Sequence, residues 1–282
     1  MISKMIRLPD FFLVGASKAG TTAICETLAN HPHICFSEQK EPDFFSEFDI
    51  SLNAIPHEKL LEYQQLFCVN ESHQLLGEGS VRYLNSPQAT YWINRYVPSA
   101  KIIIILRNPM QRIISLYEMY SRMGIMQMTP DQAFTVESYV AKQCLLYKHI
   151  IRYIDTFSKE QVLIMTFDDF LKDQAQAFLR LCQFIGVQKT SNMTMPERNK
   201  GGVPRSKSLS WMSNRKLIRI AKKILPISKR AQVDNFIKKT FFKKISLSSI
   251  QQDQLKQFFY GDVEQISNLI ERDLCQEWQL DV

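Results

Sequence analysis

A run of five consecutive aliphatic residues, Ile102 to Leu106, constrains the fold of this 282-residue chain more than any other feature. Its β-branched side chains would point to both faces of a strand, so the strand must be buried on both sides. Such strands are typical of a parallel sheet that helices cover on each face. The run is also too short for a membrane span, which needs about 20 apolar residues.

Other apolar segments predict further strands, and amphipathic segments between them predict helices. Apolar runs predict strands at residues 10–15, 34–36, 75–78, 101–106 and 161–166. Amphipathic patterns predict one helix after Gly20, one that starts at Pro109, and others over residues 57–67, 87–96, 145–157, 168–185 and 255–274. This alternation predicts an α/β fold, a three-layer sandwich with a central, mostly parallel sheet flanked by helices. Ligands of such sheets bind beyond the carboxyl ends of the strands.

The segment after the first strand is typical of an anion-binding loop. Gly15 and Gly20 allow a tight turn, and the following helix directs its first N–H groups and its dipole toward a bound anion. A Walker A loop carries lysine directly after its second glycine, but here that position is Thr21 and the lysine is Lys18. A lysine in the turn suits a 5′-phosphate better than a triphosphate. We therefore expect an anion cradle rather than a site for Mg-ATP chemistry.

The last six residues of this loop resemble the 5′-phosphosulfate loop of sulfotransferases that use 3′-phosphoadenylyl sulfate (PAPS). The family usually has P-K-x-G-T-T, and this chain has Ser17, Lys18, Ala19, Gly20, Thr21 and Thr22. The resemblance covers nearly the whole chain and is nearest to the carbohydrate or heparan-sulfate branch and its bacterial relatives. It implies a P-loop-NTPase-like sandwich, PAPS as the cofactor, adenosine 3′,5′-bisphosphate as its product, and no required metal.

Two further segments resemble parts of the donor site in this family. Arg107 ends the buried strand and Ser115 follows on the next helix, as in the family's 3′-phosphate motif. A guanidinium fork and a serine hydroxyl suit a terminal phosphate. Later in the chain, the resemblance implies that Lys200, Gly201 and Arg205 belong to a loop that closes over the nucleotide.

The segment from Gly77 to Leu84 resembles the G-E-K-[ST]-P-x-Y segment of carbohydrate sulfotransferases, in which the glutamate is the proposed general base. The resemblance implies that Glu78 takes the acceptor's proton as the S–O bond forms. Gly79 replaces the family's lysine, which removes one positive charge from the site. Lys40, within Lys40-Glu41-Pro42, belongs to another recurrent family segment that could reach the active site.

Basic residues are concentrated late in the chain. Residues 198–244 hold 15 lysines and arginines against one acid, Asp234, so they carry +14 and the rest of the chain carries −7 of the total of +7. This asymmetry indicates an anionic partner, such as an anionic polysaccharide or a membrane surface, whereas nucleic acid is not expected. We expect one sulfotransferase domain over residues 1–282, with an α/β core (1–187), a basic lid loop and helices (188–250) and a closing C-terminal helix (251–282).

The six cysteines lie in apolar segments without C-x-x-C spacing. We therefore expect buried, reduced thiols and no metal site. The N-terminal residues contain no apolar segment of signal-peptide length. Both observations favour a cytoplasmic protein, or one that is peripheral at a membrane.

Together these patterns predict a PAPS-dependent sulfotransferase. It would transfer the sulfuryl group to a hydroxyl, or as a second choice to an amine, of a small-molecule, glycan or glycolipid-like acceptor. Lys18 would neutralise the leaving phosphate oxygen, and Glu78 would be the base. Two alternatives stay open: a P-loop kinase that uses Mg-ATP, and a non-enzymatic binder of anions, nucleic acid or membrane surfaces through residues 198–244.

Overall fold

The computed structural model describes residues 6–191, 193–196, 203–204, 242–243 and 245–281. The chain forms two compact units, each built from two segments. The first comprises Met1–Arg107 and Leu146–Arg198, and the second comprises Asn108–Leu145 and Asn199–Val282. The second unit thus includes helices from the middle of the chain, which the predicted subdivision assigns to the α/β core. That subdivision remains a prediction.

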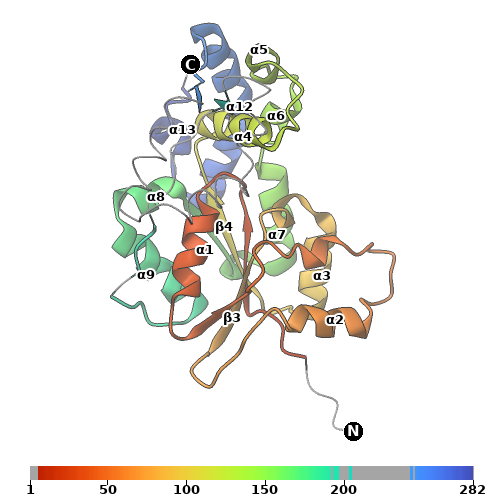
Figure 1. The fold of residues 1–282 in the computed structure, drawn as a ribbon. Helices are drawn as coiled ribbons and strands as arrows, with labels where there is room; N and C mark the ends of the chain where they lie inside the picture. The colour runs from red at the N-terminus through yellow and green to blue at the C-terminus, as the bar shows by residue number, and fades with distance from the viewer. Residues whose placement is uncertain (1–5, 192, 197–202, 205–241, 244, 282) are drawn as a thin grey trace, which may run out of the picture. The chain divides into compact units, whose positions relative to one another are not determined.

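The first unit is built around a parallel sheet (Figure 1). Five described strands lie in the order β2-β3-β1-β4-β5. They span Phe11–Gly15 (β1), Ile34–Phe36 (β2), Leu75–Gly79 (β3), Lys101–Leu106 (β4) and Val162–Thr166 (β5). Every residue from Ile102 to Leu106 is at most 1% exposed. The sequence prediction of a doubly buried strand in a parallel sheet is confirmed.

Helices cover both faces of this sheet (Figure 1). One face carries α1, α8 and α9, and the other carries α2, α3 and α7. The helices span Thr21–Ala29 (α1), His57–Gln64 (α2), Pro87–Tyr96 (α3), Tyr147–Phe157 (α7), Phe167–Lys172 (α8) and Gln174–Ile185 (α9). Short 3-10 turns occur at Phe44–Ser46 (η1), Tyr83–Asn85 (η2) and Lys159–Gln161 (η3). The predicted three-layer α/β sandwich is confirmed.

One predicted helix is two helices. The sequence pattern predicts a continuous helix over residues 168–185, but α8 ends at Lys172 and α9 begins at Gln174. Asp173 between them has an extended backbone, and its carboxylate accepts a hydrogen bond from the backbone N–H of Gln176. An aspartate in this position caps a new helix, which the apolar periodicity does not reveal.

The described part of the second unit is mostly helical. It contains Pro109–Met123 (α4), Pro130–Ala133 (α5), Tyr139–Lys142 (α6), Ser249–Ile270 (α12) and Leu274–Glu277 (α13), and a short antiparallel pair of Val203–Pro204 (β6) with Phe242–Lys243 (β7). Pro109 starts α4, as predicted, and Asn108 caps it by accepting from the N–H of Met110. Leu116, Phe134 and Phe259 belong to one buried apolar cluster, so the C-terminal helix packs with α4 in this unit.

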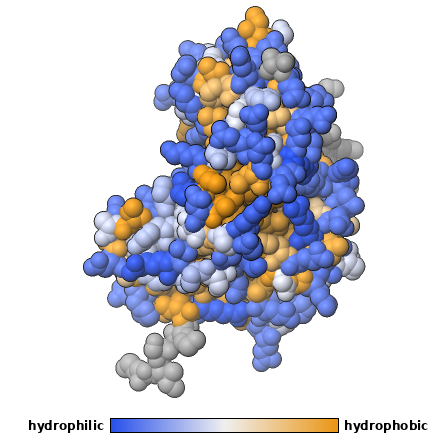
Figure 2. Space-filling model, turned by 180° about the vertical axis from the view of Figure 1, so that it is seen from behind, coloured by the Kyte–Doolittle hydropathy of each residue, from blue (hydrophilic) through white to orange (hydrophobic). Residues whose placement is uncertain are grey.

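The face seen in Figure 2 is mostly hydrophilic, with a few patches of apolar side chains. Among the described residues, no helix combines the length and the apolar character that crossing a membrane would need. All six cysteines are free thiols, and four are buried. The prediction that all six are buried is wrong for Cys25, which is half-buried, and for Cys68, which is exposed while its neighbour Phe67 is buried.

Candidate active site

The loop between β1 and α1 has the shape of an anion cradle. The backbone of Lys18 (φ 68°) and Gly20 (φ 80°) is left-handed, and it turns the chain sharply into the first turn of α1. Gly20 is the N-cap residue of α1 and offers no side chain to its N–H groups. The N–H of Ala16 donates to the carbonyl of Ile105 at 2.8 Å, which anchors the loop to β4. A phosphate fits such a helix N-terminus, where N–H groups and the helix dipole favour negative charge.

Gly20 is required here for two reasons. A left-handed conformation is costly for other residues because of their Cβ atom. In addition, a Cβ at this position would collide with the ring of Phe167 at the start of α8. The structure thus explains the second glycine of the loop through packing as well as through its conformation.

Arg107 lies beside this loop. It directly follows β4, and its Nη1 donates to the carbonyl oxygen of Lys18 at 2.9 Å. Its guanidinium also lies over the ring of Phe167, 5.6 Å from the ring centre. The structure therefore brings together two of the predicted donor-site motifs, which are almost 90 residues apart in the sequence.

The remaining predicted donor-site residues lie elsewhere in the chain. Ser115 is half-buried on α4, in the second unit. Lys200, Gly201 and Arg205 are outside the described residues, as is most of the basic segment 198–244. Their part in binding the 3′-phosphate remains a prediction.

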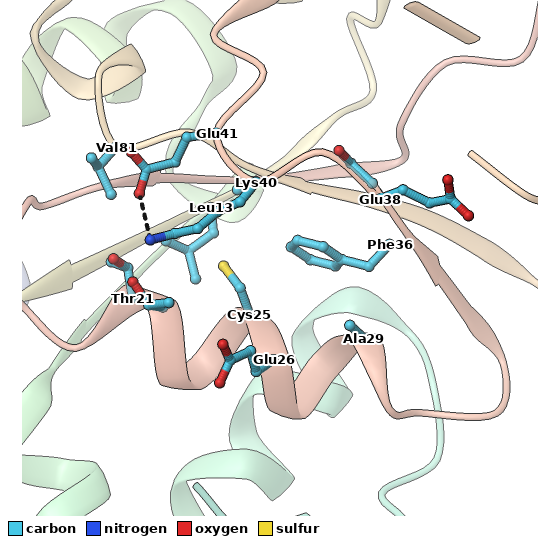
Figure 3. Close-up of a pocket in the computed structure, with 13 residues that line it drawn as sticks. Leu13, Thr21, Cys25, Glu26, Ala29, Phe36, Glu38, Lys40, Glu41 and Val81 are labelled. Atoms are coloured by element: carbon cyan, nitrogen blue, oxygen red, sulfur yellow. Dashed lines mark ion pairs between the residues drawn. The ribbon is translucent and has the colours of Figure 1, made fainter. Parts of the chain in front are cut away.

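A cavity of about 360 Å³ opens along α1 (Figure 3). Its walls come from α1, from β1 to β3, and from the segment that follows β2. The lining residues are Leu13, Thr21, Thr22, Cys25, Glu26, Ala29, Phe36, Ser37, Glu38, Lys40, Glu41, Gly79 and Val81. Since Thr21 and Thr22 belong to both the cradle and the cavity, a molecule in the cavity would lie next to an anion in the cradle.

The charged side chains that line this cavity come from α1, which supplies Glu26, and from the segment after β2, which supplies Glu38, Lys40 and Glu41. Lys40 and Glu41 form an ion pair in which Nζ and Oε1 are 3.6 Å apart (Figure 3). The thiol of Cys25, one turn along α1 from Thr21, also points into the cavity. Burial raises its pKa to about 12, so this thiol stays protonated near neutral pH and is a poor nucleophile. The reactive polar groups of the cavity are therefore Lys40 and the carboxylates.

Glu78 lies behind the wall of the cavity. Its side chain is fully buried, and its carboxylate accepts hydrogen bonds from the hydroxyls of Tyr63, Ser80 and Tyr83. Burial raises the pKa of Glu78 to about 7, although the three hydroxyls act in the opposite direction. The neighbouring residues Gly79 and Val81 line the cavity, but Glu78 does not.

The described residues contain no group of three or more histidine, cysteine, aspartate or glutamate side chains that could hold a metal ion. The site is thus made of a backbone cradle, two cationic side chains near it, and a cavity with carboxylates. This combination suits the transfer of an anionic group from a phosphate-bearing donor.

Comparison with known proteins identifies the family. A family model described as "Sulfotransferase domain" matches residues 8–243 of the chain. The chain belongs to the sulfotransferase family. The predicted family is confirmed, and the anion cradle with its Arg107 contact lies within the matched region.

Curated relatives of this sulfotransferase chain are larger proteins. It is 29% identical over 203 residues to the bifunctional heparan sulfate N-deacetylase/N-sulfotransferase 3 of Mus musculus, covering 66% of this chain and 23% of that protein. It is 26% identical over 149 residues to a membrane-associated sulfotransferase of Dictyostelium discoideum, covering 53% of this chain and 31% of that protein. The chain thus spans about a quarter to a third of the length of these relatives.

Solved structures show the same fold. A sulfotransferase from Alicyclobacillus acidocaldarius superimposes with a TM-score of 0.67 and 24% identity, over 97% of this chain and 100% of that chain. The sulfotransferase domain of the curacin biosynthetic pathway gives a TM-score of 0.51 and 15% identity, over 95% and 99% of the two chains. These similarities support the P-loop-NTPase-like sandwich.

The candidate site contains residues that the sequence patterns do not single out. Glu41 lines the cavity beside Lys40, and only the lysine of that pair is named from the sequence. The glutamate was visible in the same Lys40-Glu41-Pro42 segment. Cys25 was detectable as well, because it lies three and four residues after Thr22 and Thr21 and therefore on the same face of α1. No sequence signal joins Tyr63 to Glu78, because they lie on different elements.

Gly79 departs from the family pattern for a reason that the structure makes visible. A Cβ at Gly79 would lie 2.5 Å from the Sγ of Cys25 and 3.3 Å from the ring of Phe36. The space that a larger residue would need at this position is therefore taken by Cys25. In this chain the cavity wall has a thiol and an aromatic edge where a lysine is common in the family.

Proposed function

We propose that this chain transfers the sulfuryl group of PAPS to a hydroxyl, or as a second choice to an amine, of a carbohydrate or glycolipid-like acceptor. The observation that carries the proposal is the bond from Arg107 to the Lys18 carbonyl, since it joins two of the predicted donor-site motifs. The left-handed loop and the uncapped helix N-terminus fit a phosphate group.

The donor would be held by the chain's own cradle. PAPS, when bound, supplies the sulfuryl group and a phosphate as leaving group. The N–H groups and hydroxyls of Thr21 and Thr22 would hold its 5′-phosphate, and Lys18 would stabilise the negative charge that develops on the leaving oxygen. Arg107 would hold the 3′-phosphate, with the predicted help of Ser115, Lys200, Gly201 and Arg205.

Two carboxylates are candidates for the general base. The family resemblance proposes Glu78, but a base must come within hydrogen-bond reach of the acceptor, and Glu78 is buried among three hydroxyls. Glu41 lines the cavity together with Thr21 and forms an ion pair with Lys40. The geometry supports Glu41 as the group that takes the acceptor's proton.

The charged residues that line the cavity limit the class of acceptor that we propose. Three glutamates, Glu26, Glu38 and Glu41, line it together with one lysine, Lys40. This balance disfavours a densely sulfated polyanion inside the cavity and favours a neutral or amine-bearing sugar. The apolar walls at Leu13, Phe36 and Val81 would pack against the faces of such a ring.

An anionic polysaccharide or a membrane surface at the basic segment 198–244 remains part of the proposal. One relative is described as membrane-associated, and a cytoplasmic protein that is peripheral at a membrane would match that description. The basic segment would retain such a partner through its charge, with binding that weakens as salt is added.

The first experiment is a thermal-shift titration with adenosine 3′,5′-bisphosphate, and in parallel with Mg-ATP. At 100 times Kd, a ligand stabilises its protein by about 2.7 kcal/mol, which raises Tm by several degrees at this size. Arg107→Ala should lose the shift. Arg152→Ala is the matched control, because Arg152 is also a half-buried arginine that donates to a backbone carbonyl, that of Leu84 at 2.6 Å. A shift with Mg-ATP alone would replace this proposal with the kinase alternative.

A further inference from the structure

The segment after β2 is held against the end of β3 at two points. The N–H of Ser37 donates to the carbonyl oxygen of Gly77 at 3.0 Å. The N–H of Asp43 donates to Ser80 Oγ, also at 3.0 Å. The two attachment points lie on either side of Gly79 in the sequence. The middle of the segment therefore lies close to this glycine, and both line the cavity.

Lys40 is the middle residue of this segment, and its side chain lies in the cavity. Figure 3 shows its ammonium directed at the carboxylate of Glu41. Among the described residues that line the cavity, Lys40 carries the one positive charge. Burial and the carboxylate of Glu41 raise the pKa of the Cys25 thiol, whereas Lys40 lowers it. The ammonium is therefore within electrostatic reach of groups on α1, at the opposite wall.

A side chain at position 79 would enter the same cavity. The Cβ of a residue in place of Gly79 would meet the Sγ of Cys25 at 2.5 Å and the ring of Phe36 at 3.3 Å, and both of these residues line the cavity. A lysine at this position, which is common in the family, would therefore extend into the cavity. In this chain the glycine leaves that space, and Lys40 brings a positive charge into it from another element.

The ion pair between Lys40 and Glu41 leaves the ammonium able to bind a further anion. Its Nζ–Oε1 distance of 3.6 Å exceeds the roughly 2.7–2.9 Å of a tight charge-assisted hydrogen bond. The side chain of Lys40 is 61% exposed, and an exposed pair of this kind contributes little stability. An ammonium also has three hydrogens to donate. An anionic group that arrives in the cavity can therefore take up one or more of them.

We infer that Lys40 is a catalytic residue, which stabilises the negative charge of the sulfuryl oxygens during transfer and replaces the lysine that is common at position 79 in the family. The inference rests on the proposed function. Thr21 and Thr22 line the cavity and also begin α1 at the cradle, so a group carried by a phosphate in the cradle reaches the cavity there.

The two lysines of the site would act on different atoms. During transfer the acceptor oxygen bonds to sulfur as the bond from sulfur to the donor's phosphate oxygen breaks, and the acceptor's proton passes to the base. Lys18, from the cradle loop, would neutralise the phosphate oxygen that leaves. Lys40, from the cavity, would act on the sulfuryl oxygens, where fixed positive charge lowers the barrier.

Lys40→Met is the first variant of the test, because it removes the charge and keeps an unbranched side chain. Its kcat for sulfuryl transfer should fall tenfold or more, up to about 10³-fold, the effect of one preorganised donor. A second measurement requires no turnover. Without acceptor, calorimetry should show that the Kd of PAPS rises about tenfold, the effect of one charge-assisted hydrogen bond. The Kd of adenosine 3′,5′-bisphosphate, which lacks the sulfuryl group, should stay unchanged.

Moving the charge to β3 distinguishes a catalytic role from a structural one. The triple variant Lys40→Met/Cys25→Ala/Gly79→Lys carries its lysine at position 79, and Cys25→Ala removes the Sγ that the new Cβ would meet. Gly79 is a β-strand residue, so a lysine can adopt its backbone conformation. Compared with Lys40→Met/Cys25→Ala, the triple variant should regain most of the lost kcat and of the lost PAPS affinity. A lysine that only holds Glu41 in place could not be replaced from β3.

Lys59→Met is the matched control. Lys59 is also an exposed lysine in an ion pair, with Glu62 at 2.6 Å on α2, and neither residue lines the cavity. This variant should keep the wild-type kcat and the wild-type affinity for both nucleotides. It separates the loss of one surface charge from the loss of the charge in the cavity.

Two results would overturn the inference while the wild type binds the bisphosphate and transfers sulfuryl groups. One is a Lys40→Met variant whose kcat falls less than tenfold. The other is a loss of kcat that a folded triple variant does not regain. If circular dichroism shows that the triple variant is unfolded, the two nucleotides decide: an equal effect of Lys40→Met on both affinities overturns the inference, and a selective loss of PAPS affinity supports it. A wild type that binds neither nucleotide would instead overturn the proposed function.

Discussion

Arg107 donates a hydrogen bond to the carbonyl oxygen of Lys18 at 2.9 Å, which ties the end of β4 to the loop after β1. The bond holds a guanidinium at the edge of the cradle while the ring of Phe167 supports its plane. In the proposed function, the 3′-phosphate of the donor would therefore meet a cation that is already in place, so that little side-chain entropy is lost on binding.

The first prediction concerns the shape of this cation. Arg107→Lys keeps the charge but loses the planar fork, so it should weaken the binding of adenosine 3′,5′-bisphosphate about tenfold or more, which is the effect of one charge-assisted hydrogen bond. Isothermal titration calorimetry measures it. Arg152→Lys is the control, and its affinity should equal that of the wild type. If the wild type and both variants bind adenosine 3′,5′-bisphosphate equally well, Arg107 does not contact the donor.

The second prediction concerns Gly20. Gly20→Ala places a Cβ on a left-handed backbone, which should lower stability by about 1–2 kcal/mol. The same Cβ would also collide with the ring of Phe167. Gly124→Ala at the end of α4 is a matched control, because Gly124 has a similar φ of 75° with no atom near its Cβ position. Urea denaturation should show a larger loss of stability for Gly20→Ala. In a Phe167→Ala background, Gly20→Ala should lose only as much stability as Gly124→Ala does, because the collision with the ring is gone. Equal losses of stability for Gly20→Ala and Gly124→Ala in the wild-type background would contradict the packing argument.

The third prediction concerns the departure of Gly79 from the family pattern. Gly79→Ala should destabilise the protein by about 1–3 kcal/mol, the usual cost of overpacking, because its Cβ would overlap the Sγ of Cys25. In a Cys25→Ala background the same change should cost clearly less. A double-mutant cycle on the free energy of unfolding measures the difference. Additive losses would show that Cys25 is not what excludes a side chain at this position.

The strands and the cradle were predictable from sequence because their signals are local. The run from Ile102 to Leu106 is recognisable by itself, and Gly20, Thr21 and Thr22 are adjacent in the chain. The surroundings of Glu78 were not predictable, because Tyr63 reaches it from α2 and Tyr83 from a turn after β3, and only tertiary packing brings them together. The role of Glu78 as the base remains a prediction from the resemblance, and the burial of its carboxylate is a feature that only the fold reveals.

The fourth prediction is a pH dependence of stability. The pKa of Glu78 is about 7 in the folded protein, against 4.5 for an ordinary glutamate, because of its burial. Between these values the folded state holds a proton that the unfolded state has released. The free energy of unfolding should therefore fall as pH rises from about 4.5 to about 7, by up to about 1.4 kcal/mol per pH unit from this group.

Glu78→Gln isolates this contribution. Tyr63, Tyr83 and Cys25, which face the carboxylate, have raised pKa values and stay neutral in this range, and Asp43 is the other carboxyl whose pKa burial raises. Asp43 is present in both proteins and cancels in the comparison. Urea denaturation at several pH values measures the free energy of unfolding of both proteins. The difference between wild type and Glu78→Gln should change between about pH 4.5 and about pH 7. Parallel curves would mean that Glu78 titrates normally.

The last prediction concerns the base. If Glu41 takes the acceptor's proton, Glu41→Gln should lower kcat by about 10²- to 10⁴-fold without changing the affinity for adenosine 3′,5′-bisphosphate, because the cradle is intact. Glu38→Gln is the matched control, since Glu38 lines the same cavity and loses the same charge. Sulfuryl transfer from PAPS to a panel of neutral and amine-bearing sugars measures both. A similar loss in the two variants would point to the charge of the cavity as the cause, whereas a loss confined to Glu41→Gln requires a specific contact between that carboxylate and the acceptor.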